Sequence, residues 1–119
     1  MEYSISILIR HAPYGRIDAA EAIRHAGGAI SEGIRTHVLL VDDGVYVARV
    51  GHDPDGTAWT SLIPPLSKAL ANGTRVYVHA PSAQVRGLPQ NGDLIAGVEF
   101  IQDDALAEIL ATSGAIMVY

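Results

Sequence analysis

TRVYVHAPSAQVRGL, residues 74–88, contains the pattern that decides the fold. The apolar run at 76–79 predicts a short buried strand, and the Ala-Pro-Ser that follows interrupts it. A polar helical segment at 83–86 comes next and ends at Gly87. In an open parallel α/β sheet such a junction is the carboxyl end of a strand, where ligands and chemistry are placed. His79 is the titratable residue there, which makes it the first candidate site residue.

Short apolar runs and helical patterns alternate on both sides of this stretch. Further strands are predicted at 3–10, 36–41, 96–101 and 115–119. Helices are predicted at 18–32, 63–71 and 104–112, with Asp18 and Asp103 as N-caps and two prolines in the first turn of the second helix. A loop is expected at 88–92.

The segment VDDGVYVARV, residues 41–50, has two interpretations. The Asp-Gly pair between β-branched runs is typical of a hairpin with a type I′ turn. Alternatively, Asp43 caps a short helix over 45–50. The alternation of strands and helices around the segment favours the helix, although valine is a modest helix former.

Strands that alternate with helices indicate a mainly parallel sheet that is covered on both faces through right-handed crossovers. The predicted fold is therefore a three-layer α/β/α sandwich with a five-stranded sheet. With 119 residues, the chain is expected to form one domain, 1–119. Hydrophobic residues make up 49% of the chain and charged residues only 18%, so part of the surface is expected to be buried in an oligomer.

Composition also excludes several classes of function. The formal net charge is −5 and no basic run is present, which argues against binding to nucleic acid or to an anionic membrane. The apolar runs are shorter than a membrane span and no signal peptide pattern precedes the first strand, so we expect a cytoplasmic protein. The chain has no cysteine. Disulfides, thiolate metal ligands, cysteine nucleophiles and persulfides on this chain are thereby excluded.

Polar side chains follow three of the predicted strands, and parallel strands bring their carboxyl ends to one edge. These residues are His11 and Tyr14, then Asp42 and Asp43, then His79 and Ser82. Such a set suits general acid–base chemistry or ligand binding. His79 and His11 are the catalytic candidates. The ligand-binding candidates are Tyr14, Asp42, Asp43, His79 and Ser82. Ordinary capping residues at strand ends are the alternative. No His-x-His or His-x-x-x-His spacing supports a metal site, and none is expected.

Other features have mainly structural interpretations. Gly27 and Gly28 lie inside a predicted helix, where each costs about 1 kcal/mol relative to alanine. They suggest close approach of another element, either the sheet or a neighbouring subunit. His52 is expected to be a solvated turn residue, and His25 and His37 to be structural. Trp59, the only tryptophan, is expected to lie in the core or an interface.

Several of these segments together resemble one protein family. They are the opening strand that ends in HAPYG, the helix with AGGA, the segment VDDGV, the run VYVH followed by RGL at 86–88, and the terminal IMVY. In this order and spacing they are similar to the DsrE/DsrF family, which includes the small TusC and TusD sulfur-relay subunits. The resemblance implies a sheet with the strand order four-three-two-one-five. It also implies a helix, and not a hairpin, after Asp43.

The resemblance also bears on the persulfide chemistry of the family. Members of the DsrE or TusD type carry a persulfide on a cysteine eight residues before the glycine of the Arg-Gly pair. Counted from Gly87, that position is His79, and a histidine cannot carry a sulfane sulfur. DsrF and TusC-type subunits assemble beside the cysteine-bearing subunit, and stand-alone relatives form homotrimers or homohexamers.

The sequence therefore predicts a non-catalytic DsrE/DsrF-like subunit that acts through oligomer assembly, with no cofactor. Its expected partners are copies of itself, in a trimer or hexamer, or a cysteine-bearing DsrE-like subunit. Enzymatic activity is not the preferred expectation. The alternative is a small-molecule-binding protein or small enzyme that uses a cleft formed by His11, His79 and Asp43.

Overall fold

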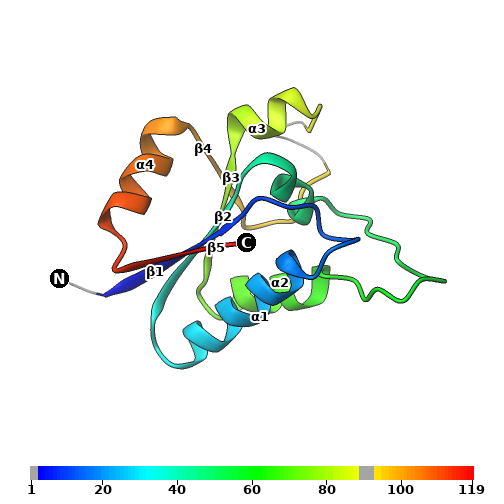
Figure 1. The fold of residues 1–119 in the computed structure, drawn as a ribbon, viewed down its shortest axis with the longest axis horizontal. Coiled ribbons are helices and arrows are strands. Elements are labelled where there is room, and N and C mark those ends of the chain that lie inside the picture. The colour runs from blue at the N-terminus through cyan, green and yellow to red at the C-terminus, as the bar shows by residue number, and fades with distance from the viewer. Residues whose placement is uncertain (1–2, 89–92) are drawn as a thin grey trace.

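A computed structural model of the chain describes residues 3–88 and 93–119. Strands and helices alternate along it (Figure 1). The elements are β1 (Ser4–Ile9), α1 (Asp18–Ser31), β2 (Arg35–Leu40), the 3₁₀ helix η1 (Asp42–Ala48), α2 (Ile63–Ala71), β3 (Arg75–His79), α3 (Ala80–Val85), β4 (Glu99–Ile101), α4 (Asp103–Thr112) and β5 (Ala115–Val118). No helix within the described residues is long and apolar enough to cross a membrane.

The five strands form one parallel sheet with the order β4-β3-β2-β1-β5. This confirms the predicted strand order and the predicted α/β class. β1 lies between β2 and β5, and its Ile7 is level with Val38 on one side and Met117 on the other. All the carboxyl ends of the strands therefore meet at one edge of the sheet.

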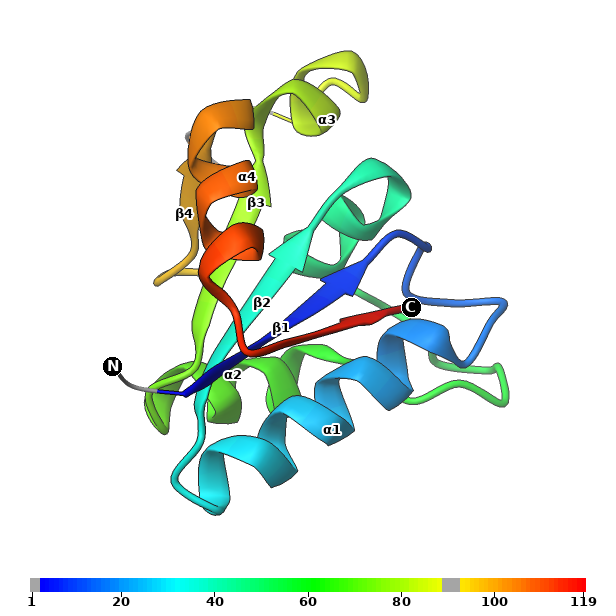
Figure 2. The same ribbon diagram turned by 60° about the vertical axis from the view of Figure 1, so that its left-hand side comes forward.

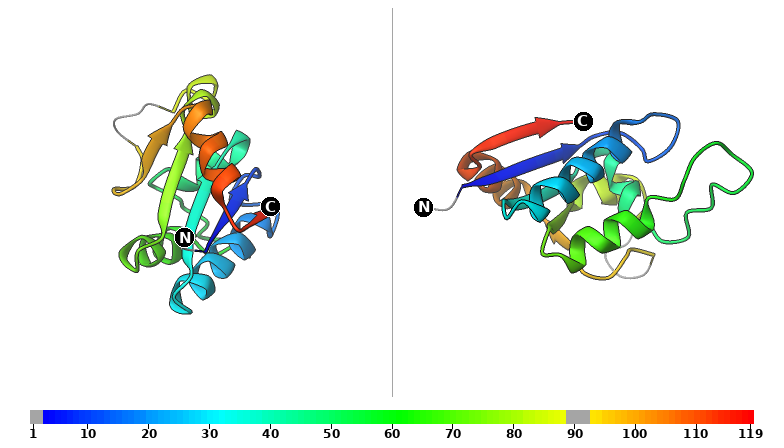
Figure 3. Two further views of the ribbon diagram at one scale, coloured as in Figure 1. Left: turned by 90° about the vertical axis from the view of Figure 1, so that its left-hand side faces the viewer. Right: turned by 90° about the horizontal axis from the view of Figure 1, so that it is seen from below.

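Helices cover the two faces of the sheet unequally. The chain steps from β1 to β2, β3 and β4 in one direction, so right-handed crossovers place α1 and α2 on the same face. The connection from β4 to β5 runs back across the sheet, and α4 consequently lies on the opposite face (Figures 1 and 2). Figure 3 shows α1 and α2 side by side beneath the strands.

The core lies between the sheet and α1 with α2. Alternate strand residues face this core, and α1 contributes a stripe at helical spacing because Ala19, Ala22, Ile23 and Ala26 are all buried. Each fully buried aliphatic side chain stabilises the fold by about 1.5–3 kcal/mol relative to an exposed one. The strand residues that share this buried face are Ile5, Ile7, Ile9, Val38, Leu40, Val76 and Val78.

The opposite face of the sheet is less completely covered. None of the residues of α4 is buried. On the neighbouring edge strand β5, the side chains of Ile116 and Val118 are 47% and 58% exposed. An edge strand with exposed apolar side chains is a typical site for association with another chain.

The predicted N-caps are wrong. Asp18 and Asp103 are the first residues of α1 and α4, and the capping positions belong to Ile17 and Gln102, neither of which makes a side-chain capping bond. The carboxylates have stronger partners, because Arg16 Nε lies 2.7 Å from Asp18 Oδ2 and His79 bonds to Asp103. The arginine bond holds the pKa of Asp18 below its ordinary value.

The segment after β2 is a helix, as the alternation and the resemblance predicted, and not a hairpin. It is a 3₁₀ helix that begins at Asp42, and its N-cap is Val41, so the predicted cap at Asp43 is wrong. Gly44 explains the sharp turn, because a Cβ at this position would overlap the backbone carbonyl of Ile9. Only glycine permits η1 to pack this closely on the end of β1.

Other boundaries also differ from the predictions. Helix α3 begins at Ala80 directly after β3, and Pro81 lies within its first turn, where the absent N–H has no cost. The predicted end of the strand before Ala80 is confirmed, whereas the predicted helix start at 83 is wrong because α3 begins three residues earlier. β4 is shorter than predicted and starts at Glu99. Of the predicted loop at 88–92, residues 89–92 lie outside the described residues.

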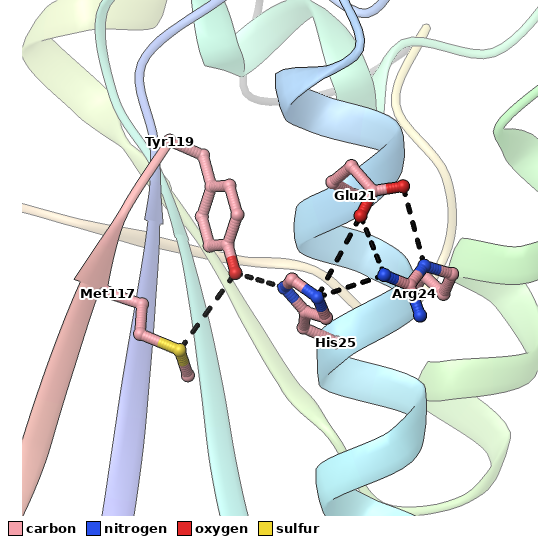
Figure 4. A network of polar contacts seen from close by, with 5 residues as sticks. All are labelled: Glu21, Arg24, His25, Met117 and Tyr119. Atoms are coloured by element: carbon pink, nitrogen blue, oxygen red, sulfur yellow. Dashed lines mark hydrogen bonds and ion pairs between the residues drawn. The ribbon is translucent and has the colours of Figure 1, made fainter.

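The end of the chain is fastened to α1. The Tyr119 hydroxyl forms a hydrogen bond with His25 Nδ1, and Arg24 Nη2 lies 3.1 Å from the other ring nitrogen (Figure 4). Arg24 is in turn held by Glu21 at 2.7 Å. Burial, and then the negative charge of Glu21, raises the pKa of Tyr119. His25 is therefore structural, as predicted, and it links β5 to the helix on the core face.

Candidate functional site

His79 stands at the carboxyl end of β3 between a hydroxyl and a carboxylate. Its Nδ1 lies 2.7 Å from Ser82 Oγ, and its Nε2 lies 2.6 Å from Asp103 Oδ1. Ser82 follows three residues later in the first turn of α3, while Asp103 opens α4 immediately after the neighbouring strand β4. The imidazole is only 15% exposed, whereas the Asp103 side chain is 83% exposed.

The donors and acceptors of this group form a consistent chain. The backbone N–H of Asp42 donates to Ser82 Oγ at 2.9 Å, and the ionised Asp103 carboxylate only accepts. In a neutral imidazole the proton therefore resides on Nε2, and Nδ1 accepts the Ser82 hydroxyl. Both ring nitrogens are used. Since Ser82 is buried, its hydroxyl is not presented to solvent as a reactive group. The two hydrogen bonds instead fix the orientation of the His79 ring.

The Asp42–Asp43 pair lies beside His79, and each carboxylate faces its own cation. Arg10 Nε lies 3.6 Å from Asp42 Oδ2, and Arg86 Nε donates to Asp43 Oδ1 at 2.9 Å. Arg86 also donates to the backbone carbonyl of Ser82 at 3.1 Å. The two aspartates are therefore engaged separately and do not form a carboxylate pair that shares a proton.

Asp42 has an unusual backbone conformation. Its φ angle of 50° is the only positive one among the non-glycine residues that the structure describes. A left-handed residue costs roughly 1–2 kcal/mol, and the hydrogen bond from Asp42 N–H to Ser82 helps to hold it. The His79 group thus also determines how the chain leaves β2.

A second polar group follows β1. Tyr14 Oη lies 2.8 Å from His52 Nδ1, and His52 Nε2 lies 3.1 Å from the backbone carbonyl of Tyr46. The carbonyl only accepts, so Nε2 carries the proton and Nδ1 accepts the Tyr14 hydroxyl. The Tyr14 oxygen in turn accepts the backbone N–H of Leu62 at 3.2 Å. The prediction that His52 is a solvated turn residue is therefore wrong.

The six predicted site residues all follow strand ends, but they do not form a single group. Asp42, Asp43, His79 and Ser82 lie together around the ends of β2 and β3, while Tyr14 belongs to the separate group with His52. His11 follows β1, which β2 separates from β3. Its Nδ1 is buried and has no hydrogen-bond partner within the described residues. A cleft shared by His11 and His79 stays a prediction.

Four residues of these groups were not predicted as site residues. They are Asp103, which was expected only as a cap, Arg10, Arg86 and His52. Nothing in the local sequence pairs these residues with the predicted site residues, because each contact joins different strands or loops. Within 3–88 and 93–119, no three His, Asp or Glu side chains are grouped as metal ligands.

The fold and this edge define a small parallel α/β protein with polar side chains gathered at the carboxyl ends of its strands. The chain belongs to the DsrE/DsrF-like family, whose family model matches residues 4–119. The family resemblance in the sequence is thereby confirmed over nearly the whole chain.

Individual relatives agree with this assignment. An uncharacterised protein of Methanopyrus kandleri is 34% identical over 95 residues, which cover 80% of this chain and 76% of the relative. The intracellular sulfur oxidation protein DsrF of Allochromatium vinosum is 37% identical over 92 residues, or 74% of this chain and 65% of DsrF. The crystal structure of the Escherichia coli ychN protein superposes with a TM-score of 0.88 at 21% identity, covering 98% of this chain and 99% of that protein. The last similarity concerns the fold alone.

Proposed function

We propose that this chain is a non-catalytic, cysteine-free subunit of the sulfur-relay type, which acts through assembly with copies of itself or with a cysteine-bearing relative. Its relation to a sulfur oxidation protein, DsrF, supports the biological context. The proposal assigns to the chain a structural role in an oligomer, while any sulfur would be carried by another subunit.

The chemistry of the chain supports the non-catalytic part of the proposal. Without a cysteine the chain cannot form a persulfide. The position at which the family resemblance places that cysteine is His79, and both nitrogens of its ring are bonded within the chain. The residue therefore supports the local structure of β3, α3 and α4.

The assembly part rests chiefly on the incompletely covered face of the sheet. Ile116 and Val118 of edge strand β5 are about half exposed, and α4, which covers the same face of the sheet, has no buried residue. Burial of such apolar surface against another chain is favourable by about 25 cal/mol per Å². We therefore assign the assembly surface to the exposed face of β5 together with α4.

Gly27 and Gly28 add a second, weaker argument. Outside the backbone of α1 itself, a Cβ at either position meets no atom of the described residues within 4 Å, so the predicted close approach by the sheet is wrong. The other expectation, that a neighbouring subunit approaches these glycines, stays a prediction. A bulky residue at Gly28 would then weaken assembly without disturbing the packing of α1 within the chain.

The proposal is tested by sedimentation of the wild type and of two charge variants. Val118→Glu places a charge on the proposed surface and is expected to shift the protein to smaller species. Val85→Glu is the matched control because Val85 is 80% exposed on α3, away from β5. If Val118→Glu leaves the sedimenting species of a well-folded protein unchanged, the assigned surface is wrong.

A second candidate function is binding or turnover of a small molecule at the edge that carries His79. The hydrogen-bonded chain from Asp103 through His79 to Ser82 favours this candidate, because such chains orient imidazoles in enzymes. It predicts a ligand whose affinity or turnover changes in His79→Gln. Identical behaviour of that variant towards any ligand found for the protein would remove this candidate.

A further inference from the structure

We propose that the depression between the end of β1 and η1 is a binding site for a small organic monocarboxylate, separate from the group around His79. The depression has a volume of about 550 Å³, which suits a small molecule. It lies at the carboxyl edge of a parallel sheet, where such proteins place their ligands. Its lining includes Pro13, Tyr14, Tyr46, Arg49, His52 and Asp93.

Arg49 supplies the charge that recognises the carboxylate. Its guanidinium forms no ion pair and no side-chain hydrogen bond within the described parts of the chain. By contrast, five other arginines each face a carboxylate, namely Arg10, Arg16, Arg24, Arg75 and Arg86. A guanidinium can bind a carboxylate through two parallel hydrogen bonds. Arg49 therefore has its full donor capacity available in the depression.

The aromatic part of the lining is already ordered. Tyr14 is held between His52, at 2.8 Å, and the backbone N–H of Leu62, at 3.2 Å. His52 is held by the Tyr46 carbonyl at 3.1 Å. Because these bonds fix the rings before a ligand enters, less conformational entropy is lost on binding. The aromatic rings and Pro13 offer apolar surface to the carbon skeleton of the ligand.

Asp93 limits the charge of the ligand. Asp93 lines the same depression, and its carboxylate would repel a second negative charge on the ligand. The site consequently favours a monoanion with an apolar body over a compact dianion such as inorganic phosphate.

The proposal is tested by two-dimensional NMR titration of the full chain with benzoate and, separately, with inorganic phosphate. Benzoate is expected to shift the signals of Arg49, His52 and Trp59, whose ring centroid lies 6.5 Å from that of Tyr14, with a Kd of about 1 mM or tighter. Arg49→Ala is expected to weaken this binding roughly tenfold or more, because a hydrogen-bonded charge pair is lost.

Arg75→Ala is the matched control, since it removes an equal charge from the opposite end of β3, where Arg75 pairs with Glu99 at 2.8 Å. It should bind benzoate as the wild type does. Equal weakening in both variants, tighter binding of phosphate than of benzoate, or no saturable shift at these residues would each overturn the proposal. The outcome is independent of the assembly function, because that function concerns the face of β5 and α4.

Discussion

His79 Nε2 lies 2.6 Å from the carboxylate of Asp103, and this contact joins the end of β3 to the first residue of α4. On its other side the ring is hydrogen-bonded to the hydroxyl of Ser82, which accepts a hydrogen bond from the backbone N–H of Asp42. His79, at the position where the family resemblance places the persulfide cysteine, therefore connects three segments at the carboxyl edge. We propose that its role in this chain is to hold them in place.

We predict that His79→Ala destabilises the protein more than Asp103→Asn does. The first change leaves the buried Ser82 hydroxyl without its acceptor, at a cost of about 1–3 kcal/mol in the free energy of unfolding. The second removes only an exposed charge, which contributes about 0–1 kcal/mol. Urea unfolding of the two variants measures the difference. A loss in His79→Ala no larger than in Asp103→Asn would contradict the positioning role of His79.

We predict that Gly44→Ala destabilises the fold by about 1–3 kcal/mol, because the added Cβ would overlap the Ile9 carbonyl and force η1 away from β1. Gly28→Ala is the control, since a Cβ there meets no atom within 4 Å in the part of the chain that the structure describes, the backbone of α1 aside. Alanine at this helical position should stabilise by roughly 0.5–1 kcal/mol. Thermal unfolding distinguishes the two effects, because the melting temperature should fall in Gly44→Ala and rise in Gly28→Ala. A rise in both variants would show that η1 tolerates the extra atom.

Loss of the Tyr119 hydroxyl should weaken the attachment of β5 to α1. Tyr119→Phe leaves His25 without this partner (Figure 4) and is expected to cost about 1 kcal/mol. Hydrogen exchange of the β5 amides should also become faster. Tyr3→Phe serves as control, because Tyr3 is 61% exposed. If both variants are equally stable, the hydrogen bond between Tyr119 and His25 does not contribute to the free energy of unfolding.

Stability should depend on pH through His37. Burial, followed by the positive charges of Arg35 and Arg75, lowers the pKa of His37. The unfolded chain therefore binds this proton more readily than the folded chain does. The free energy of unfolding should be highest above the ordinary histidine pKa of about 6.5 and fall as the pH drops below it.

His37→Gln tests this assignment because glutamine does not titrate. Urea unfolding at neutral and at mildly acidic pH should show a smaller loss of stability in the variant than in the wild type. An identical loss in both proteins would assign the acid sensitivity to other groups.

The fold was predictable because its main signals are local. Apolar runs indicated the strands, the helical pattern at 18–32 indicated α1, and alternation indicated a parallel sheet. The strand order was not contained in these patterns; the family resemblance supplied it. Helix boundaries failed where tertiary partners intervened. Asp18 and Asp103 look like caps in the sequence, but Arg16 and His79 bind their carboxylates instead.

The candidate site was predictable only in part. A parallel sheet dictates that His79, Ser82 and Asp42 lie near one another, since all three follow strand ends. The placement of His52 against Tyr14 depends on the path of the long connection between η1 and α2, which carries no periodic signal. The pairing of Asp43 with Arg86 likewise joins two segments that are distant in sequence.

The most direct test of the assembly claim is a pull-down of the tagged chain from its own host, followed by native mass spectrometry of what elutes. We predict a closed oligomer, formed either from copies of this chain or in a fixed ratio with a similarly sized cysteine-containing protein. The second result would place any persulfide on the partner. A monomer that elutes without any partner would contradict the account.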